Sequence, residues 1–308
     1  MSKNLFFVGI ILAAAGVLSP PLALGAGLAY GLLTVHHYRL EAQRLSKFLL
    51  QASVVCLGFG MNVGEVVRVG RSGILYTAVG ITFALGLGLL LGRLFRVGQI
   101  QSFLISAGTA ICGGSAIAAL GPVTGAGEEA MAVSMGTVFV LNSVALFIFP
   151  VIGGALHLSQ TQFGLWAALA IHDTSSVVGA SAKYGSVALA VGTMVKLARA
   201  LWIVPVALVV AVARKSNARV RWPWFIGFFV IAAVMNSYVP WLGPAYPTLA
   251  RLGRLGLAVT LFLIGTGINR EMIRKVGARP LVQGVLLWVA VAGVSLWAIV
   301  EGWIRLGR

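Results

Sequence analysis

The chain has 308 residues, of which 59% are hydrophobic and only 10% are charged. A soluble domain carries roughly 25% charged residues, because water must wet its surface, so this composition excludes an ordinary soluble protein. The net charge of +16 does not indicate nucleic acid here, since the basic residues lie between apolar runs, where Lys and Arg set membrane topology. We expect a lipid bilayer, and no nucleic acid, as the partner of this chain.

Apolar runs recur along the chain, and many reach the roughly 18 residues that let a helix cross a hydrocarbon layer about 30 Å thick. They are continuous rather than alternating, which disfavours a β-barrel. We predict one all-α integral membrane domain over residues 1–308 with 11 transmembrane helices, or 10 if the two short first runs form a broken hairpin. The predicted spans are 4–18, 21–36, 46–62, 72–92, 100–121, 130–152, 161–181, 186–212, 222–239, 249–268 and 280–303.

The first apolar run and the basic loops predict the orientation of the chain. Pro21 would hinder cleavage after the first run, so we interpret this run as a membrane helix rather than a signal peptide. If the spans alternate, most Lys and Arg residues fall on the face that holds Lys3 and the 213–221 loop. Because such an excess marks the cytoplasmic face, we expect a cytoplasmic N-terminus.

Residues 44–73 and 251–280 form an internal repeat at a constant offset of 207 positions. Both copies begin with a basic-Leu-x-basic pattern, RLSK and RLGR, and continue with Gly-x-Gly-x-Asn. The equivalent pairs are Arg44 with Arg251, Leu45 with Leu252, Gly58 with Gly265, Gly60 with Gly267, Asn62 with Asn269, and Gly70 with Gly277. The first copy starts inside and the second outside, which predicts the inverted repeat typical of secondary transporters. The alternative is a duplicated structural helix pair.

Gly113, Gly114 and Ser115 fall in the middle of the predicted span 100–121. Each glycine destabilises a helix by roughly 1 kcal/mol relative to alanine. One interpretation is close helix packing through small residues. The other is an unwound point near 112–115, where free N–H groups at a half-helix N-terminus bind a substrate.

A polar segment, His172-Asp173-Thr174-Ser175-Ser176, lies in the middle of the predicted span 161–181. A carboxylate at this depth costs roughly 3 kcal/mol on insertion scales and usually lines a cavity or a proton path. We predict a second broken helix near 172–176, with His172 and Asp173 in ion coupling and the three hydroxyl residues in substrate binding. A structural polar cluster is the alternative. Simple alternation makes the two broken helices parallel, whereas crossing helices of inverted repeats are antiparallel, so one segment is re-entrant or the span count is wrong.

Lys196 and Arg199 lie within the predicted span 186–212 and, three residues apart, share a helix face. Side chains charged at this depth need a partner, and we predict Asp173 as their counter-ion, with the remaining positive charge binding the substrate. The alternative is snorkelling of the long side chains to the membrane interface, which competes more strongly for Arg199.

These residues together resemble the sulfate exporter family of YeiH-like bacterial inner-membrane proteins. The resemblance covers nearly the whole chain and is carried by the run at 108–119 with Pro122 and Glu128-Glu129, by His172-Asp173 with 177–180, and by 196–199 leading to Pro205. Family members often carry Glu after the His, where this chain has Asp173. The resemblance implies an inner-membrane transporter of inverted repeats with discontinuous crossing helices, similar to the bile-acid and sodium–proton antiporter folds.

Three functions remain open at this point. The first is a secondary transporter that moves a small anion, such as sulfate or a sulfonate, by alternating access, coupled to protons or sodium. The second is a passive anion channel. The third, a membrane-embedded enzyme, is disfavoured because the sequence has no His-x-x-Glu-His or Gly-x-Ser-x-Gly pattern. We therefore expect no enzyme activity, no cofactor and no metal site, and the sequence leaves a homodimer open.

Overall fold

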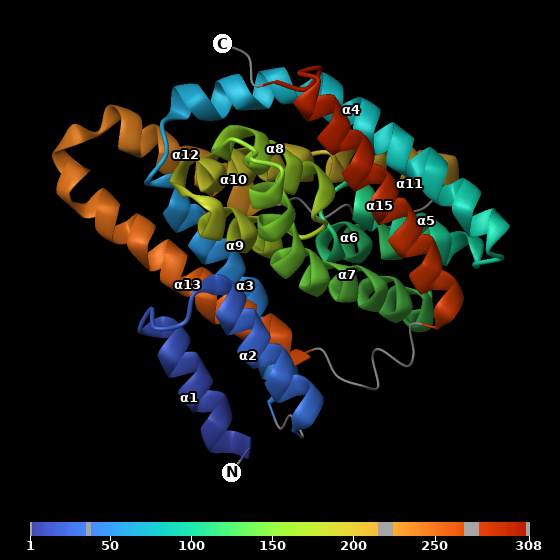
Figure 1. Ribbon diagram of the computed structural model, residues 1–308, viewed down its shortest axis with the longest axis horizontal. Coiled ribbons are helices and arrows are strands. Elements are labelled where there is room, and N and C mark those ends of the chain that lie inside the picture. Colours follow the sequence, from blue (N-terminus) through green and yellow to red (C-terminus); the bar gives the residue numbers. More distant parts are fainter. Residues whose placement is uncertain (1, 35–37, 215–223, 268–276, 306–308) are drawn as a thin grey trace.

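The computed structural model describes residues 2–34, 38–214, 224–267 and 277–305, and all regular structure among them is helical (Figure 1). This confirms the predicted all-α fold. The helices are α1 (Ser2–Ala14), α2 (Pro20–Leu33), α3 (Arg39–Gly58), α4 (Val63–Leu94), α5 (Gln99–Ala110), α6 (Gly114–Thr124), α7 (Glu128–Ala155), α8 (Gln160–Ala170), α9 (Thr174–Tyr184), α10 (Ser186–Ala200), α11 (Ile203–Arg214), α12 (Trp224–Tyr238), the 3-10 helix η1 (Pro240–Ala245), α13 (Tyr246–Gly267) and α15 (Ala278–Val300).

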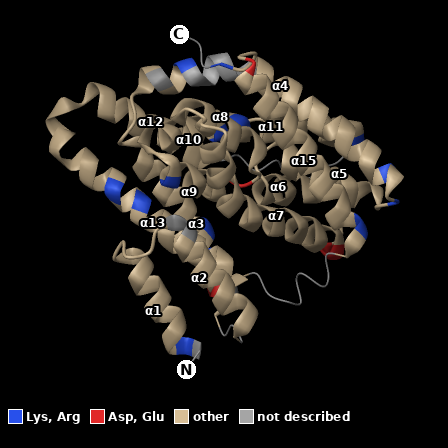
Figure 2. Cartoon of the chain, viewed as in Figure 1, with Lys and Arg blue, Asp and Glu red and all other residues tan. Residues whose placement is uncertain are grey.

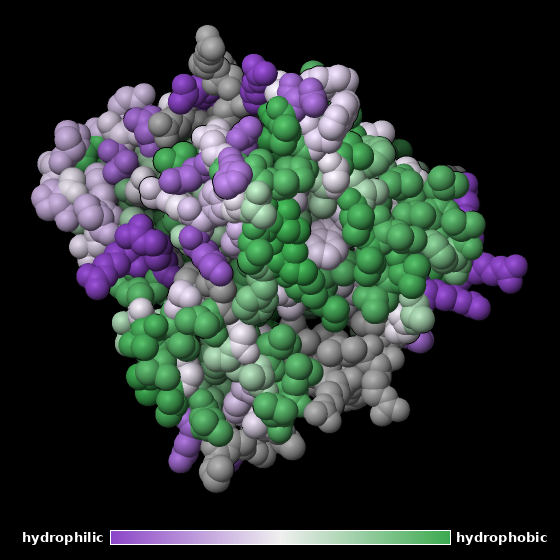
Figure 3. All heavy atoms as spheres, viewed as in Figure 1, coloured by the Kyte–Doolittle hydropathy of each residue, from purple (hydrophilic) through white to green (hydrophobic). Residues whose placement is uncertain are grey.

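Each predicted span coincides with helix, but the helices differ in length. Within the described residues, five helical stretches are long and apolar enough to cross a membrane: Leu75–Leu94, Glu128–Ala155, Ser186–Arg214, Pro240–Gly267 and Ala278–Val300. Figure 3 shows broad hydrophobic areas over α15 and over α1. Such areas suit lipid better than water, and the protein is an all-α integral membrane protein. The predicted spans 100–121 and 161–181 are each divided into two short helices.

The helices form two groups. The outer group consists of α1, α2, α3, α12 and α13, in which α13 packs against α2 and α3, and α3 packs against α12. The crossing group consists of α4 to α11 together with α15, and the broken helices lie inside it. The two groups meet along α9, which contacts both α2 and α13, and at α4, which contacts α12.

Packing inside the crossing group is matched in pairs. Helix α5 packs against α4, and its counterpart α8 packs against α15. Likewise, α6 packs against α11, and its counterpart α9 packs against α7. The pairs α5–α6 and α8–α9 therefore have equivalent surroundings. Their order along the chain differs, because α4 precedes α5 whereas α15 follows α8. An offset of 207 consequently aligns α3 with α13 and cannot align the two broken helices.

The two repeated helices pack directly against each other. A Cβ added at Gly253 of α13 would lie 2.8 Å from the Ser53 oxygen of α3, and one added at Gly60 would lie 3.2 Å from the Ala250 Cβ. Later residues of one helix thus meet earlier residues of the other, so α3 and α13 are antiparallel. Asn269, the predicted counterpart of Asn62, lies outside the described residues.

One equivalent pair of glycines, Gly58 and Gly265, makes equivalent contacts in the two copies. A Cβ at Gly58 would lie 2.6 Å from the carbonyl oxygen of Phe229 on α12, and a Cβ at Gly265 would lie 2.6 Å from that of Leu24 on α2. Only glycine allows another helix backbone to approach so closely. Gly58 and Gly265 therefore have a packing role: each lets its helix pack closely against a neighbouring helix.

Candidate functional site

The first break separates α5 from α6. Helix α5 ends at Ala110, Ile111 departs from helical geometry with φ −116° and ψ −86°, and Gly113 adopts φ +65° and ψ −130°. The backbone of Gly113 is one that side chains with a Cβ rarely adopt. The helix is thus interrupted where the glycine pair predicts, and a new N-terminus starts at Gly114.

The second break separates α8 from α9. Helix α8 ends at Ala170, Ile171 is extended, and Asp173 is the N-cap of α9. The Asp173 carboxylate accepts a hydrogen bond of 3.1 Å from the Ser175 backbone N–H and another from the Ser175 hydroxyl. A carboxylate is favoured at a helix N-terminus, because it accepts from free N–H groups and faces the positive end of the helix dipole.

The two breaks meet in the buried centre of the crossing group. A Cβ at Gly113 would lie 3.3 Å from both the Asp173 nitrogen and the His172 carbonyl carbon. Asn142 of α7 accepts a 3.1 Å hydrogen bond from the Asp173 N–H through its side-chain oxygen. Four half-helix ends therefore converge at one place, and we call this arrangement the crossing.

Lys196 and Arg199 of α10 bind the carboxyl ends of the half-helices. The Lys196 ammonium donates to the carbonyls of Ile171 at 2.7 Å and Ala168 at 3.4 Å. The Arg199 guanidinium donates through Nε to Ala110 at 2.5 Å and through Nη1 to Leu169 at 2.6 Å. These carbonyls lie at the negative ends of α5 and α8, where a helix cannot satisfy them itself, so the cations supply the missing donors.

The predicted ion pair between Asp173 and the two cations is not formed by direct contact. Asp173 accepts from Ser175 at the positive end of α9, whereas Lys196 and Arg199 donate to carbonyls at the negative ends of α5 and α8. Helix termini thus take the place of counter-ions. Snorkelling is also contradicted, since Lys196 is 0% and Arg199 is 1% exposed.

The remaining predicted site residues differ in their solvent exposure. His172 is 0% exposed, and within the described residues neither of its ring nitrogens has a hydrogen-bond partner. Thr174, Ser175 and Ser176 are buried in the first turn of α9, whereas Ser115, in the first turn of α6, is exposed. The structure therefore brings the predicted residues together around the crossing, where Ser115 is exposed and the others are buried.

Two further residues belong to the crossing. The side-chain amide of Asn142 anchors the start of α9, and an amide inside an apolar span is a recognisable signal for a bond across helices. Trp288 of α15 donates through Nε1 to the Ala170 carbonyl at 3.1 Å, and its ring lies 6.3 Å from that of His172. No sequence pattern distinguishes Trp288 from the other tryptophans of the chain.

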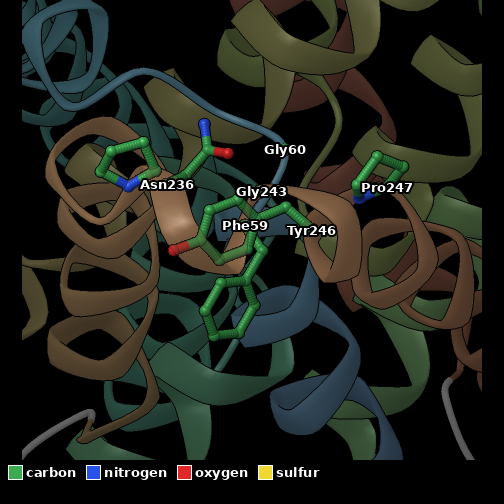
Figure 4. Close-up of a pocket in the computed structure, with 7 residues that line it drawn as sticks. Phe59, Gly60, Asn236, Gly243, Tyr246 and Pro247 are labelled. Atoms are coloured by element: carbon green, nitrogen blue, oxygen red, sulfur yellow. The ribbon is translucent and has the colours of Figure 1, made fainter.

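A pocket lies away from the crossing, between the end of α3 and η1 (Figure 4). Its polar groups are bonded within the protein, because Asn236 donates to the Met61 carbonyl and the Tyr246 hydroxyl donates to the carbonyls of Met235 and Val239. Among the described residues, no cluster of His, Cys, Asp and Glu could hold a metal ion. The crossing is therefore the candidate functional site.

The fold and the crossing define an all-α, multi-pass membrane protein with two broken helices at its centre. The family described as conserved hypothetical protein 698 matches residues 8–284. The UPF0324 membrane protein GSU2818 of Geobacter sulfurreducens is 46% identical over 303 residues, which cover 98% of each chain. A UPF0324 membrane protein of Porphyromonas gingivalis is 50% identical over 286 residues, which cover 91% of this chain and 86% of the relative. The chain belongs to this family of membrane proteins. No solved structure matches it.

Proposed function

We propose that this protein is a secondary active transporter that moves a small anion, such as sulfate or a sulfonate, across the bacterial inner membrane. One observation carries the proposal: two helices broken at the same buried place, with their half-helix ends facing each other. Secondary transporters build substrate and ion sites from such discontinuous helices. The resemblance to the sulfate exporter family supports the same function.

The N-terminus of α6 is the proposed contact for the anion. Ser115 is exposed in the first turn of this half-helix, and helix N-termini bind anions through free N–H groups and the dipole. The N-terminus of α9 is already complemented by the Asp173 carboxylate. Substrate binding is therefore assigned first to Gly114 and Ser115, with Gly113 holding the turn, and Thr174 and Ser176 on the facing half-helix.

Asp173 is the proposed coupling group. A carboxylate inside a membrane domain usually takes part in ion or proton movement, and proton binding at Asp173 would change the charge beside the substrate. His172 is less suited to this role than the sequence predicts, because it is fully buried next to two cations that it does not bond. Sodium coupling through carbonyls of the breaks remains the competing assignment.

Lys196 and Arg199 receive a revised role. Their hydrogen bonds to four carbonyls favour a structural function, in which they hold the ends of α5 and α8 together. The two helix groups then favour alternating access, with the outer group and the crossing group moving against each other along α9 while the crossing stays intact. A cytoplasmic N-terminus is part of the same proposal.

Reconstituted proteoliposomes test the proposed function. Labelled sulfate and a labelled sulfonate should accumulate only when a proton or sodium gradient is imposed, and a Gly114→Leu variant that folds should not accumulate them. Uptake that equilibrates without accumulation under every gradient would support a passive channel instead. Absence of uptake for all small anions in either orientation would contradict an anion transporter.

A further inference from the structure

Four basic side chains occupy equivalent turns of the two repeated helices. They are Arg44 and Lys47 on α3 and Arg251 and Arg254 on α13, and we call them the basic quartet. All four are exposed, and no hydrogen bond or ion pair of the described residues involves them. Basic residues near helix ends ordinarily serve as topology signals, but the position of the inner pair within its helices indicates a further role.

The inner pair, Lys47 and Arg254, lies more than two turns inside its helices. Each is eight residues after the first residue of its helix, which corresponds to about 12 Å at the usual helical rise. The stretch Pro240–Gly267, which contains Arg254, is apolar and long enough to span a membrane. A charge at such depth is costly in lipid and usually faces a water-filled cavity.

The inner pair lies on helix faces next to the seam between the two helix groups. Leu50 and Leu257 follow Lys47 and Arg254 by three residues, so each leucine shares a helix face with its cation. Both leucines pack in one cluster with Val178 of α9. Figure 2 shows Lys and Arg positions along α13 where it passes α9. The inner pair therefore borders the half-helix that begins at the crossing.

The two inner cations are close enough to act on one ion. Helices α3 and α13 are antiparallel, and Gly253 lies against Ser53 and Leu57. In this register Arg254 is level with a position about seven residues after Lys47, an axial separation of about 10 Å. Long side chains reaching towards each other from these positions would meet around a small ligand. Because Lys47 and Arg254 are equivalent positions of the repeat on antiparallel helices, their arrangement has approximate two-fold symmetry.

We infer that the basic quartet lines a water-filled path along the seam between the outer group and α9 and provides its attraction for a small divalent oxyanion. This inference rests on the proposed function in one respect, because transport would carry the ion along the path to the crossing. A divalent ion is favoured over a monovalent one, since attraction to each cation doubles with the charge of the ion. Neither the family resemblance nor the crossing assigns these residues a ligand.

Cysteine labelling tests the path without requiring transport. In a Cys56→Ala background, Lys47→Cys and Arg254→Cys are compared with Leu45→Cys and Leu252→Cys, which replace exposed apolar residues of the same helices (43% and 54% exposed). Membrane vesicles are treated with an anionic, membrane-impermeant thiol reagent from each side. The controls lie nearer the helix starts, so depth alone would make them react faster.

The expected result is labelling of Lys47→Cys and Arg254→Cys roughly tenfold faster than of the leucine controls, a free-energy difference of about 1.4 kcal/mol. In each cysteine variant the three remaining cations should also favour the anionic reagent over a neutral one of the same size. Labelling no faster than at the leucine positions would mean that the quartet faces lipid and would overturn the inference. Equal rates for anionic and neutral reagents would overturn its electrostatic part.

Transport measurements separate the path from the proposed function. Lys47→Gln combined with Arg254→Gln should raise the KM for sulfate by about tenfold or more, while Lys47→Arg combined with Arg254→Lys should stay within about threefold of wild type. If wild type transports sulfate and the Gln variant keeps its KM, the inference fails and the proposed function stands. If wild type transports no anion while the labelling contrast holds, the proposed function fails and the basic path stands.

Discussion

Gly113 of the first broken helix lies against Asp173 of the second, so close that a Cβ on Gly113 would be 3.3 Å from the Asp173 nitrogen. The same nitrogen donates its hydrogen to Asn142. The main chains of the two breaks therefore support each other directly, and a side chain between them would be tightly confined. This contact fixes the relative position of the N-termini of α6 and α9.

Gly113→Ala should destabilise the protein and abolish transport. The substitution forces a Cβ into a backbone conformation at φ +65°, at a cost of roughly 1–3 kcal/mol, and presses it against Asp173. Thermal unfolding in detergent should show a clearly lower midpoint. Gly86→Ala is the matched control, since nothing lies within 4 Å of a Cβ at Gly86, inside α4. An unchanged Tm for Gly113→Ala would contradict the contact.

Arg199→Met should lower stability because it strands the carbonyls of Ala110 and Leu169 at the centre of the fold. Each buried acceptor without a partner costs about 1–3 kcal/mol. Arg199→Lys should recover part of the loss, as a single ammonium reaches fewer carbonyls. Arg214→Met, which removes an exposed arginine bonded to the Thr124 carbonyl at 3.3 Å, should be nearly neutral. Similar Tm values for Arg199→Met and Arg214→Met would rule out the bridging role.

Asp173→Asn should preserve the fold and remove ion coupling. Asparagine caps a helix about as well as aspartate, so the bond from the Ser175 N–H should persist and stability should change by less than about 1 kcal/mol. Gradient-driven uptake in proteoliposomes should fall to the level of empty vesicles. Asp173→Ala is the complementary variant, which should also lose the cap and therefore unfold at a lower temperature. Gradient-driven uptake at wild-type level in Asp173→Asn would reject the coupling assignment.

Asp173→Asn and Lys196→Met should have additive effects on stability. The two side chains bind different partners, Ser175 and the carbonyls of Ala168 and Ile171, so no shared hydrogen bond couples them, and their effects should add within about 0.5 kcal/mol. A double-mutant cycle of unfolding free energies measures the coupling. A double variant more stable than Lys196→Met alone would indicate a direct ion pair after all.

Reporter fusions at the N-terminus and within 213–221 should both report the cytoplasm, as the excess of Lys and Arg on that face requires. Most of the 213–221 loop lies outside the described residues, so the fusions test an expectation drawn from charge alone. A periplasmic reporter at 213–221 would reverse the orientation and the inverted interpretation of the repeat.

The amino-acid sequence by itself determined the membrane class and the places where helices break. Long apolar runs commit the chain to a bilayer whatever the tertiary contacts are, and Gly113 and Asp173 act locally, through a backbone conformation and an N-cap. The repeated RLSK and RLGR patterns were equally visible, but their position beside α9 was not, because it depends on how α3 and α13 pack.

Only the tertiary structure decided the partners of the buried charges. The sequence offers Asp173 as the single nearby carboxylate, yet Lys196 and Arg199 bind carbonyls of Ala110, Ala168, Leu169 and Ile171. Every residue carries a carbonyl, so no side-chain pattern marks the ones that lose their helical partner. They become strong acceptors only where α5 and α8 end inside the protein and the folded chain brings α10 beside both ends.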